Sequence, residues 1–168
     1  MFLLSGEYFY TFQAVWRLSP FPVKVFLEVF SGSGRLSEAC GREGFTCLLW
    51  DITLGENYDL RRQEKQELIL GWLRAGFLIG VHMGTPCSSF SRARDRPGGP
   101  PQLRSDAEPL GLRGLLRECD KEKVRVGNLL MWFSARLARA AVAMRVLWTL
   151  ENPARSRLWI TPAMRRLR

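Results

Sequence analysis

A cysteine flanked by proline and small hydroxyl residues is the side chain in this sequence best suited to nucleophilic chemistry. It is Cys87, in the segment from Gly84 to Ser91 (GTPCSSFS). A thiolate attacks electrophilic carbon when its surroundings lower the thiol pKa, whereas most cysteines are buried and unreactive. The residue type alone therefore leaves two assignments open, a nucleophile and an inert core side chain, and favours the second.

A glycine-rich turn with a carboxylate further along the chain is a second candidate site. Phe30 to Gly34 reads FSGSG, and Asp51 follows the next apolar run. Glycine allows a backbone to approach a ligand closely, and an acidic residue about 20 positions downstream can bind ribose hydroxyls. Such turns also serve packing alone. A nucleotide-type cofactor site and a packing turn both remain open.

The third candidate is the sequence Glu151-Asn152-Pro153 near the C-terminus. A carboxyl group at this place is either an ordinary N-cap of the following segment or an acid that faces the same crevice as Cys87. Its position after an apolar run parallels that of the other two motifs.

Short apolar runs must position these motifs. Each run ends at one of the candidate residues, which is typical of buried parallel strands. The predicted strands are Val25–Phe30, Phe45–Trp50, Phe77–Met83 and Val146–Leu150.

Helical patterns alternate with these strands. We predict a helix after the glycine turn, a second over Gln63–Trp72 and a long third over Val124–Met144, whereas Asp95–Lys123 is rich in Pro and Gly and is predicted to be a long loop. Alternating strands and helices favour a parallel, doubly wound α/β sheet, which binds ligands at the carboxyl ends of its strands.

Length and composition fit one domain. The chain has 168 residues and a net charge of +9, and 21 of its 25 basic residues are Arg. This excess favours a phosphate-bearing partner, although a coding bias toward Arg would produce it too. We assign residues 1–22 to an N-terminal extension of unknown role and 23–168 to the domain. The four cysteines form no C-x-x-C pair and no apolar run can span a membrane, so we expect an intracellular protein, nuclear or cytoplasmic, with neither a disulfide framework nor a zinc site.

Taken together, the three motifs resemble those of the DNA (cytosine-5) methyltransferase family. Its hallmarks are a Phe-x-Gly-x-Gly cofactor turn, a Pro-Cys loop ending in Phe-Ser, and a Glu-Asn dipeptide, and all three occur here in order within residues 25–153. The resemblance implies a Rossmann-like, S-adenosylmethionine-dependent methyltransferase fold, truncated after the fifth strand.

For the cofactor, the resemblance implies S-adenosylmethionine beside the glycine turn. Leu49 stands where the family often has a ribose-binding Glu, so Asp51 is expected at the ribose and Asp59 near the adenine amino group. The expected cofactor-binding residues are Phe30, Ser31, Gly32, Ser33, Gly34, Trp50, Asp51 and Asp59.

For catalysis, the resemblance implies that the Cys87 thiolate attacks carbon 6 of a flipped-out cytosine while Glu151 protonates ring nitrogen 3. Carbon 5 then accepts the methyl group. Ser88 and Pro153 depart from the Gln and Val that are common in the family. The residues expected to contact DNA, with RNA left open, are Pro86, Ser88, Ser91, Arg92, Arg94, Arg96 and Asn152.

Fifteen residues follow Pro153, and the family's Gln-x-Arg-x-Arg motif and target-recognition domain are not among them. We therefore expect this chain to need a missing C-terminal half or a second chain for turnover. Two other functions stay open. One is a catalytically dead, basic nucleic-acid-binding scaffold. The other is an amino-methyltransferase, which leaves Glu151 and Asn152 without a role.

Overall fold

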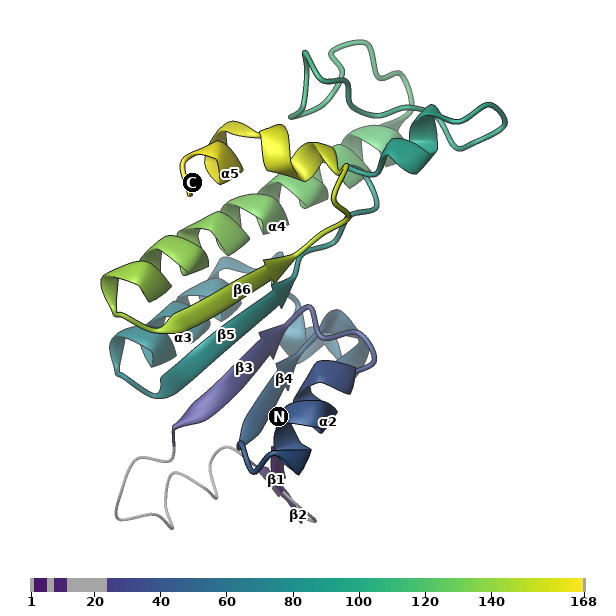
Figure 1. Cartoon of the computed structure of the whole chain (residues 1–168). Helices are drawn as coiled ribbons and strands as arrows, with labels where there is room; N and C mark the ends of the chain where they lie inside the picture. The colour runs from purple at the N-terminus through teal and green to yellow at the C-terminus, as the bar shows by residue number, and fades with distance from the viewer. Residues whose placement is uncertain (1, 6–7, 12–23, 168) are drawn as a thin grey trace. The chain divides into compact units, whose positions relative to one another are not determined.

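A computed structural model describes residues 2–5, 8–11 and 24–167 of the chain. Its strands form one sheet in the order β2-β1-β4-β3-β5-β6 (Figure 1). The strands are β1 Phe2–Ser5, β2 Tyr8–Thr11, β3 Val25–Val29, β4 Cys47–Trp50, β5 Leu78–Gly84 and β6 Leu147–Glu151. The helices are α2 Arg35–Arg42, α3 Gln63–Arg74, α4 Glu118–Ala143 and α5 Pro162–Arg165, with 3₁₀ turns η1 Ile52–Leu54, η2 Glu56–Tyr58, η3 Arg92–Asp95 and η4 Arg157–Ile160.

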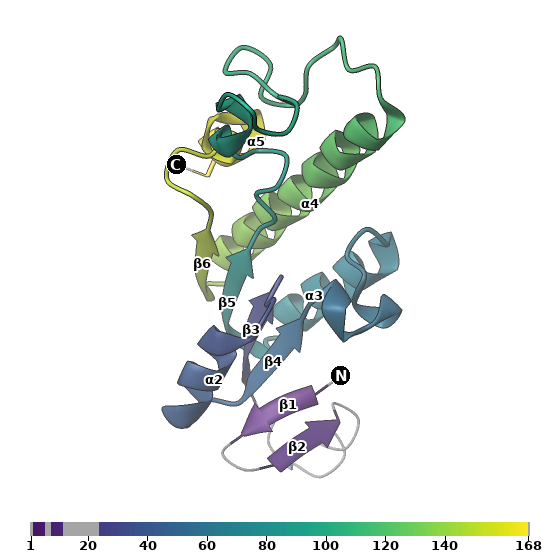
Figure 2. The same cartoon turned by 90° about the vertical axis from the view of Figure 1, so that its right-hand side faces the viewer.

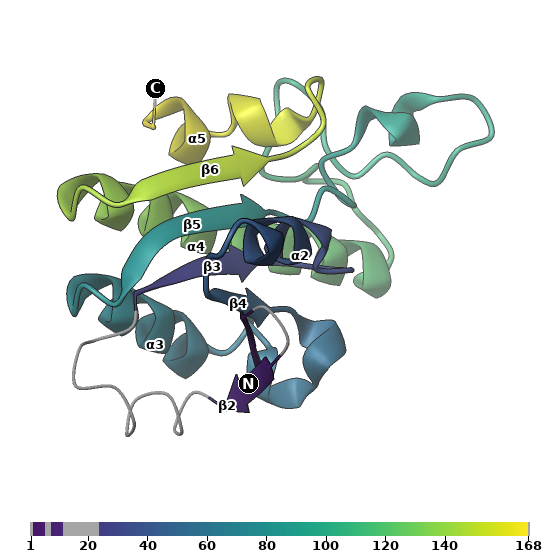
Figure 3. The ribbon, with the colours of Figure 1, turned by 60° about the horizontal axis from the view of Figure 1, so that its bottom comes forward.

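The four predicted strands are present and run in one direction. In Figure 1 the arrows of β4, β3, β5 and β6 all point the same way, and β3 pairs in parallel with both β4 and β5. Figure 3 shows α2 on one face of the sheet and α3 on the other. The prediction of a parallel α/β sheet is therefore confirmed.

A hairpin extends this sheet beyond β4. β1 pairs antiparallel with β4 and with β2 (Figure 2). The hairpin accounts for eight residues of the predicted N-terminal extension. The others, residues 1, 6–7 and 12–22, lie outside the described residues.

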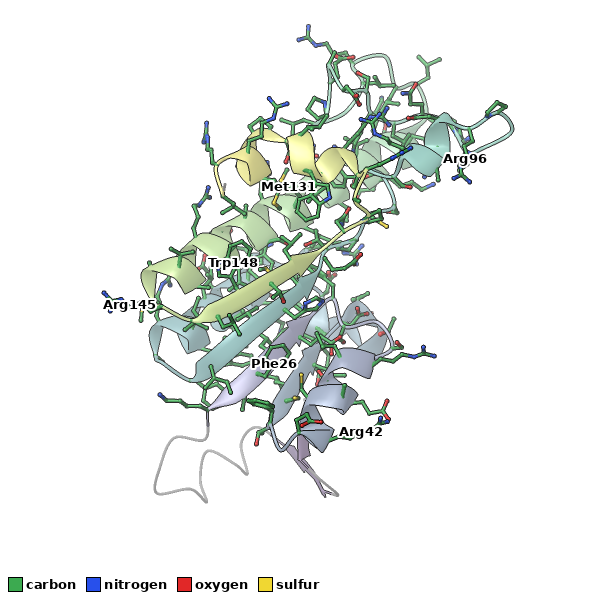
Figure 4. The ribbon with its side chains drawn as sticks, in the orientation of Figure 1. Phe26, Arg42, Arg96, Met131, Arg145 and Trp148 are labelled. Carbon is green, nitrogen blue, oxygen red and sulfur yellow. The ribbon has the colours of Figure 1, made fainter. Side chains whose placement is uncertain are left out.

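The central strand β3 is covered on both faces, one lined by aliphatic side chains and the other carrying Phe26 and the buried Glu28. Val25, Leu27 and Val29 of β3 are fully buried, as expected for a parallel strand between two helical layers. A Cβ added at Gly80 would lie 2.9 Å from the ring of Phe26, so the glycine lets this side chain, labelled in Figure 4, lie against β5.

The described chain divides into two compact units. The first, here called the sheet unit, comprises residues 1–84 and 137–150, and the second, the loop unit, comprises 85–136 and 151–168. The glycine turn and Asp51 belong to the sheet unit, whereas Cys87 and Glu151 belong to the loop unit. Helix α4 contributes residues to both.

Two predicted boundaries of the long helix were wrong. α4 begins at Glu118, six residues before the predicted start, so the loop after η3 covers 96–117. Glu118 and Asp120 lie in the first turn, where negative charge interacts favourably with the helix dipole. At the other end Met144 was predicted to belong to the apolar stripe, but it lies beyond the helix and is exposed.

In the described residues, no helix combines the length and the hydropathy that crossing a bilayer requires.

Candidate active site

The glycine turn after β3 has an unusual backbone. Phe30, Gly32 and Gly34 have φ angles of 59°, 53° and 71°. The left-handed region costs glycine little, but it is an outlier for a bulky side chain such as Phe. Phe30 N donates to Trp50 O at 2.8 Å, which holds the strained residue, and Gly34 N donates to Ser31 O at 2.8 Å, which closes the turn. Such strain clusters at ligand sites in folded proteins.

The two glycines of the turn have different reasons to be glycine. A Cβ at Gly34 would come too close to the terminal methyl of Leu49, so this side chain would have to shift, and the positive φ itself favours glycine. A Cβ at Gly32 would meet no atom within 4 Å, and both Gly32 and Ser33 are exposed. The open side of the turn is therefore at Gly32, where a ligand could approach the backbone.

Asp51 lies against this turn, as predicted. Its Oδ2 accepts a hydrogen bond from Gly32 N at 2.9 Å, and its Oδ1 accepts two from the Thr53 backbone and hydroxyl. Burial opposes ionisation of the carboxyl, but these hydrogen bonds outweigh it and hold the pKa of Asp51 below its usual value. Three of the roughly four lone-pair positions of the carboxylate are thus used, which leaves room for one ribose hydroxyl.

Two buried polar groups accompany the turn, and sequence reasoning missed one of them. Glu28 lies inside β3, in a run predicted to be apolar, and its Oε2 accepts a hydrogen bond from Ser37 N at 2.8 Å. Ser31 is buried, and its Oγ has no hydrogen-bond partner among the described residues. An unpaired buried hydroxyl next to an open backbone suits a polar ligand.

The remaining predicted cofactor residues have other partners in the sheet unit. Trp50 is buried, and its indole N–H donates to Tyr58 O at 2.9 Å. Asp59 accepts hydrogen bonds on both carboxylate oxygens from the Arg61 guanidinium, which holds the pKa of Asp59 below its usual value. Trp50 is therefore a core residue, and Asp59 would have to share its carboxylate between Arg61 and an adenine amino group.

The Cys87 turn lies in the loop unit. β5 ends at Gly84, and Cys87 is a half-buried free thiol three residues later. Cys87 O accepts hydrogen bonds from Phe90 N and Ser91 N, both at 2.9 Å, which close one helical turn around the cysteine. Ser91 Oγ then caps η3 by accepting from Ala93 N at 3.2 Å.

The third motif is hydrogen-bonded to this turn. Asn152 Nδ2 donates to Thr85 O at 2.6 Å, so the segment after β6 is joined to the segment after β5. Ser134 Oγ donates to Leu130 O at 3.0 Å, and its other hydrogen bond, 2.8 Å from Thr85 Oγ1, fixes Thr85 to α4. Asn152 Oδ1 is buried with no described partner, and Glu151 beside it is exposed. The loop unit therefore brings the Cys87 and Glu151 motifs together.

The arginines after the turn differ from the expectation that they bind phosphates. Arg92 donates to Asp106 and to Arg155 O, and Arg94 donates to Ser88 O and Pro101 O. Both side chains therefore hold the loop itself. Arg96, labelled in Figure 4, is exposed at the end of η3. The prediction of a phosphate contact stays open for Arg96, whereas Arg92 and Arg94 would first have to leave these partners.

Buried Arg157 also holds this loop in place, through ion pairs that were not predicted from the sequence. Its guanidinium forms a two-bond ion pair with Asp95 at 2.8–2.9 Å and a third bond with Asp106 at 3.0 Å. The Arg157 hydrogen bonds hold the pKa of Asp95 below its usual value. In the sequence these acids look like ordinary members of a charged loop, and no local signal pairs them with a residue over 50 positions away.

The chain matches no protein-family model, no curated protein and no solved structure. Nor do the described residues contain a group of three or more His, Cys, Asp or Glu side chains arranged to hold a metal ion.

Proposed function

We propose that this chain carries the chemistry of S-adenosylmethionine-dependent methylation at carbon 5 of cytosine in DNA, with Cys87 as nucleophile and Glu151 as acid. The observation that carries the proposal is the hydrogen bond from Asn152 to Thr85, which joins the Glu151 segment to the Cys87 segment. A nucleophile and an acid that act on one ring must come from neighbouring segments.

The residues of the sheet unit fit the cofactor. Among the described residues, Gly32 has an open side, Ser31 Oγ has no hydrogen-bond partner, and Asp51 keeps one acceptor position. Asp51 would bind the ribose, the turn from Phe30 to Gly34 would follow the amino-acid part, and Asp59 would reach the adenine amino group. When bound, the cofactor supplies a methyl group on a sulfonium.

On this proposal Cys87 Sγ forms a bond to carbon 6 of the cytosine while the proton of Glu151 moves to nitrogen 3. The electron pair of the carbon 5–carbon 6 double bond would then form the bond from carbon 5 to the methyl group, while the methyl–sulfur bond of the sulfonium would break and leave its electron pair on sulfur as a neutral thioether. A base removes the proton of carbon 5, the Sγ–C6 bond breaks, and the Cys87 thiolate is released as nitrogen 3 returns its proton. Asn152 keeps Glu151 beside this reaction through Thr85.

The distribution of charge supports a polyanionic substrate. The loop unit holds 15 Lys and Arg against 7 Asp and Glu, and the sheet unit holds 10 against 9. Nearly all of the net charge of +9 therefore belongs to the unit that carries Cys87. A net positive charge of this size favours a phosphate backbone through electrostatic attraction and counterion release, although Arg92, Arg94, Arg104 and Arg157 are bound inside the loop unit.

The same charge favours a second candidate, an inactive nucleic-acid-binding module, and one experiment separates the two. The full chain is incubated with S-adenosylmethionine and a single-stranded oligonucleotide containing 5-fluorocytosine, because a single strand requires no base flipping. A base cannot remove fluorine from carbon 5 as it removes a proton. The elimination that would release Cys87 is therefore blocked, and a covalent adduct to Cys87 accumulates. A single strand removes the base-flipping step for which a missing C-terminal half is expected to be needed, so the proposal expects this chain by itself to form a denaturation-resistant adduct. The adduct should disappear in Cys87→Ala and persist in the matched control Cys119→Ala, since Cys119 is an exposed cysteine on α4.

Each other outcome has a meaning. Binding of the oligonucleotide without an adduct supports the inactive module. Binding of S-adenosylmethionine with methyl transfer to an exocyclic amine supports an amino-methyltransferase. An adduct that survives Cys87→Ala refutes the assignment of the nucleophile.

A further inference from the structure

The loop unit contains a fully buried arginine. Arg104 has no exposed surface, and no carboxylate among the described residues forms an ion pair with it. Burial lowers the pKa of Arg104 to about 10, so the side chain is still protonated at neutral pH. A charge in this position is costly unless every donor is satisfied, because the group has lost its hydration.

Each of the five N–H donors of Arg104 has an acceptor. Nε donates to Ser89 Oγ at 3.3 Å, and Nη2 donates to the same oxygen at 2.9 Å and to Val124 O at 3.1 Å. Nη1 donates to Pro109 O at 2.8 Å and to Asn128 Oδ1 at 2.7 Å. Lysine offers only three donors in a different geometry and could not make this set.

The same guanidinium packs on the ring of Phe90. Its Cζ lies 3.7 Å from the ring centroid, within the range of a cation–π contact. Arg104 therefore contacts two consecutive residues of the Cys87 turn, Ser89 and Phe90. It also contacts two residues of α4, Val124 and Asn128.

A glycine in α4 independently marks this contact. Gly127 lies within the helix, where glycine is unfavourable relative to alanine. A Cβ there would collide with Ser89 Oγ and lie 2.9 Å from Arg104 Nη2 and 3.3 Å from the Phe90 ring. The helix thus has its smallest residue at the place where the turn and the buried cation meet it.

We propose that Arg104 is the positioning residue of the Cys87 turn, a buried cation that fixes the backbone of the nucleophile segment against α4. The link to the cysteine is direct, because the amides of Phe90 and Ser91 both donate to Cys87 O. Fixing Ser89 and Phe90 therefore fixes the turn that presents the thiol. The role in methylation rests on the proposed function, whereas the positioning itself is a property of the fold.

The experiment compares Arg104→Lys, which keeps the charge, with the unaltered full chain. Hydrogen exchange at the Phe90 and Ser91 amides reports on the turn. In the same samples, alkylation of Cys87 by iodoacetamide is measured by mass spectrometry across pH 6–10, with Cys119 as the internal reference. We expect exchange at these two amides to be about tenfold faster, the change that about 1.4 kcal/mol of lost stabilisation gives, and a changed pH profile for Cys87 but not for Cys119.

A second variant keeps the guanidinium and disturbs the contact from the helix side. Gly127→Ala should also speed exchange at the Phe90 and Ser91 amides and change the pH profile of Cys87. It therefore tests the proposal even if Arg104→Lys fails to fold. The matched control is Gly114→Ala, because a Cβ at Gly114 meets no atom within 4 Å. Amide exchange in α3 of the sheet unit serves as the reference for global stability.

Unchanged amide exchange and an unchanged Cys87 profile in a folded variant would overturn the proposal. So would an equal loss of protection in the Cys87 turn and in α3, because Arg104 would then contribute only general stability. Neither readout requires DNA or cofactor. Failure of the methylation assay with these results intact would refute the proposed function and leave the positioning role standing.

Discussion

Substituting each of the two glycines of the turn after β3 distinguishes an effect on stability from an effect on cofactor binding. In Gly34→Ala the new Cβ has to occupy a left-handed conformation, which costs about 1 kcal/mol. It also collides with Leu49, and overpacking costs a further 1–3 kcal/mol or so. We expect a loss of about 2–4 kcal/mol, which for a chain of this length lowers Tm by roughly 4–16 °C.

Gly32→Ala carries only the backbone cost of about 1 kcal/mol, because nothing lies within 4 Å of the new Cβ. Its effect should appear instead in binding, since the methyl group occupies the open side of the turn. We expect loss of S-adenosylmethionine binding in a protein that remains folded.

Urea denaturation and isothermal titration calorimetry on the two variants test this pair of expectations. Shortening the colliding side chain in the double variant Gly34→Ala/Leu49→Ala should recover the overpacking part of the loss, which the double-mutant cycle isolates. Equal stability of Gly34→Ala and the unaltered chain would refute the packing of the turn. Undiminished binding by Gly32→Ala would refute the cofactor assignment.

Three further predictions concern stability and reactivity. Asn152→Ala removes the donor to Thr85 O and should lower the free energy of unfolding in urea by about 1–3 kcal/mol. It should also abolish the covalent adduct, and an adduct formed at full rate would show that this hydrogen bond is dispensable. The folded-state pKa of Asp51 lies below its usual value of about 4, so the carboxylate stabilises the fold at neutral pH, and this contribution is lost as the pH falls from about 4 toward the lowered pKa. In Asp51→Asn the free energy of unfolding, measured by tryptophan fluorescence, should therefore decrease less over this pH range than in the unaltered chain. An equal decrease in the two proteins would contradict the assignment. Burial raises the pKa of Cys47 to about 12, so iodoacetamide at pH 8 should label exposed Cys119 and leave Cys47 unmodified until the chain is denatured, and labelling of native Cys47 would contradict its burial.

The strands could be predicted from the sequence because apolar runs and glycine punctuation are local signals. Their ends were shifted by one or two residues for reasons that the runs do not carry. Phe30 continues the apolar pattern of Val25–Val29, but its backbone is left-handed and ends the strand. The start of α4 was missed because its first turn is charged and follows a loop rich in Pro and Gly.

The motifs of the candidate site could be predicted from the sequence, but the buried arginines that hold these segments in place could not. Cys87, Asp51 and Asn152 belong to short patterns that can be recognised along the chain. Arg104 and Arg157 act through partners 5 to 62 residues away, and their spacing in the sequence does not indicate which acceptors they reach. Of the three arginines predicted to contact phosphates, Arg92 and Arg94 hold the loop itself, whereas the prediction stays open for Arg96.

The neighbouring strands β5 and β6 are separated by the 62 residues 85–146. During synthesis at about 5–20 residues per second, the outer edge of β5 therefore waits roughly 3–12 s for its neighbour to be made. An unpaired strand edge can recruit other chains during that interval. The slow, long-range step of folding is thus the return of β6, and the hydrogen bond from Asn152 to Thr85 cannot form before it. A nascent chain consequently contains Cys87 for seconds before the segment that bears Glu151 exists.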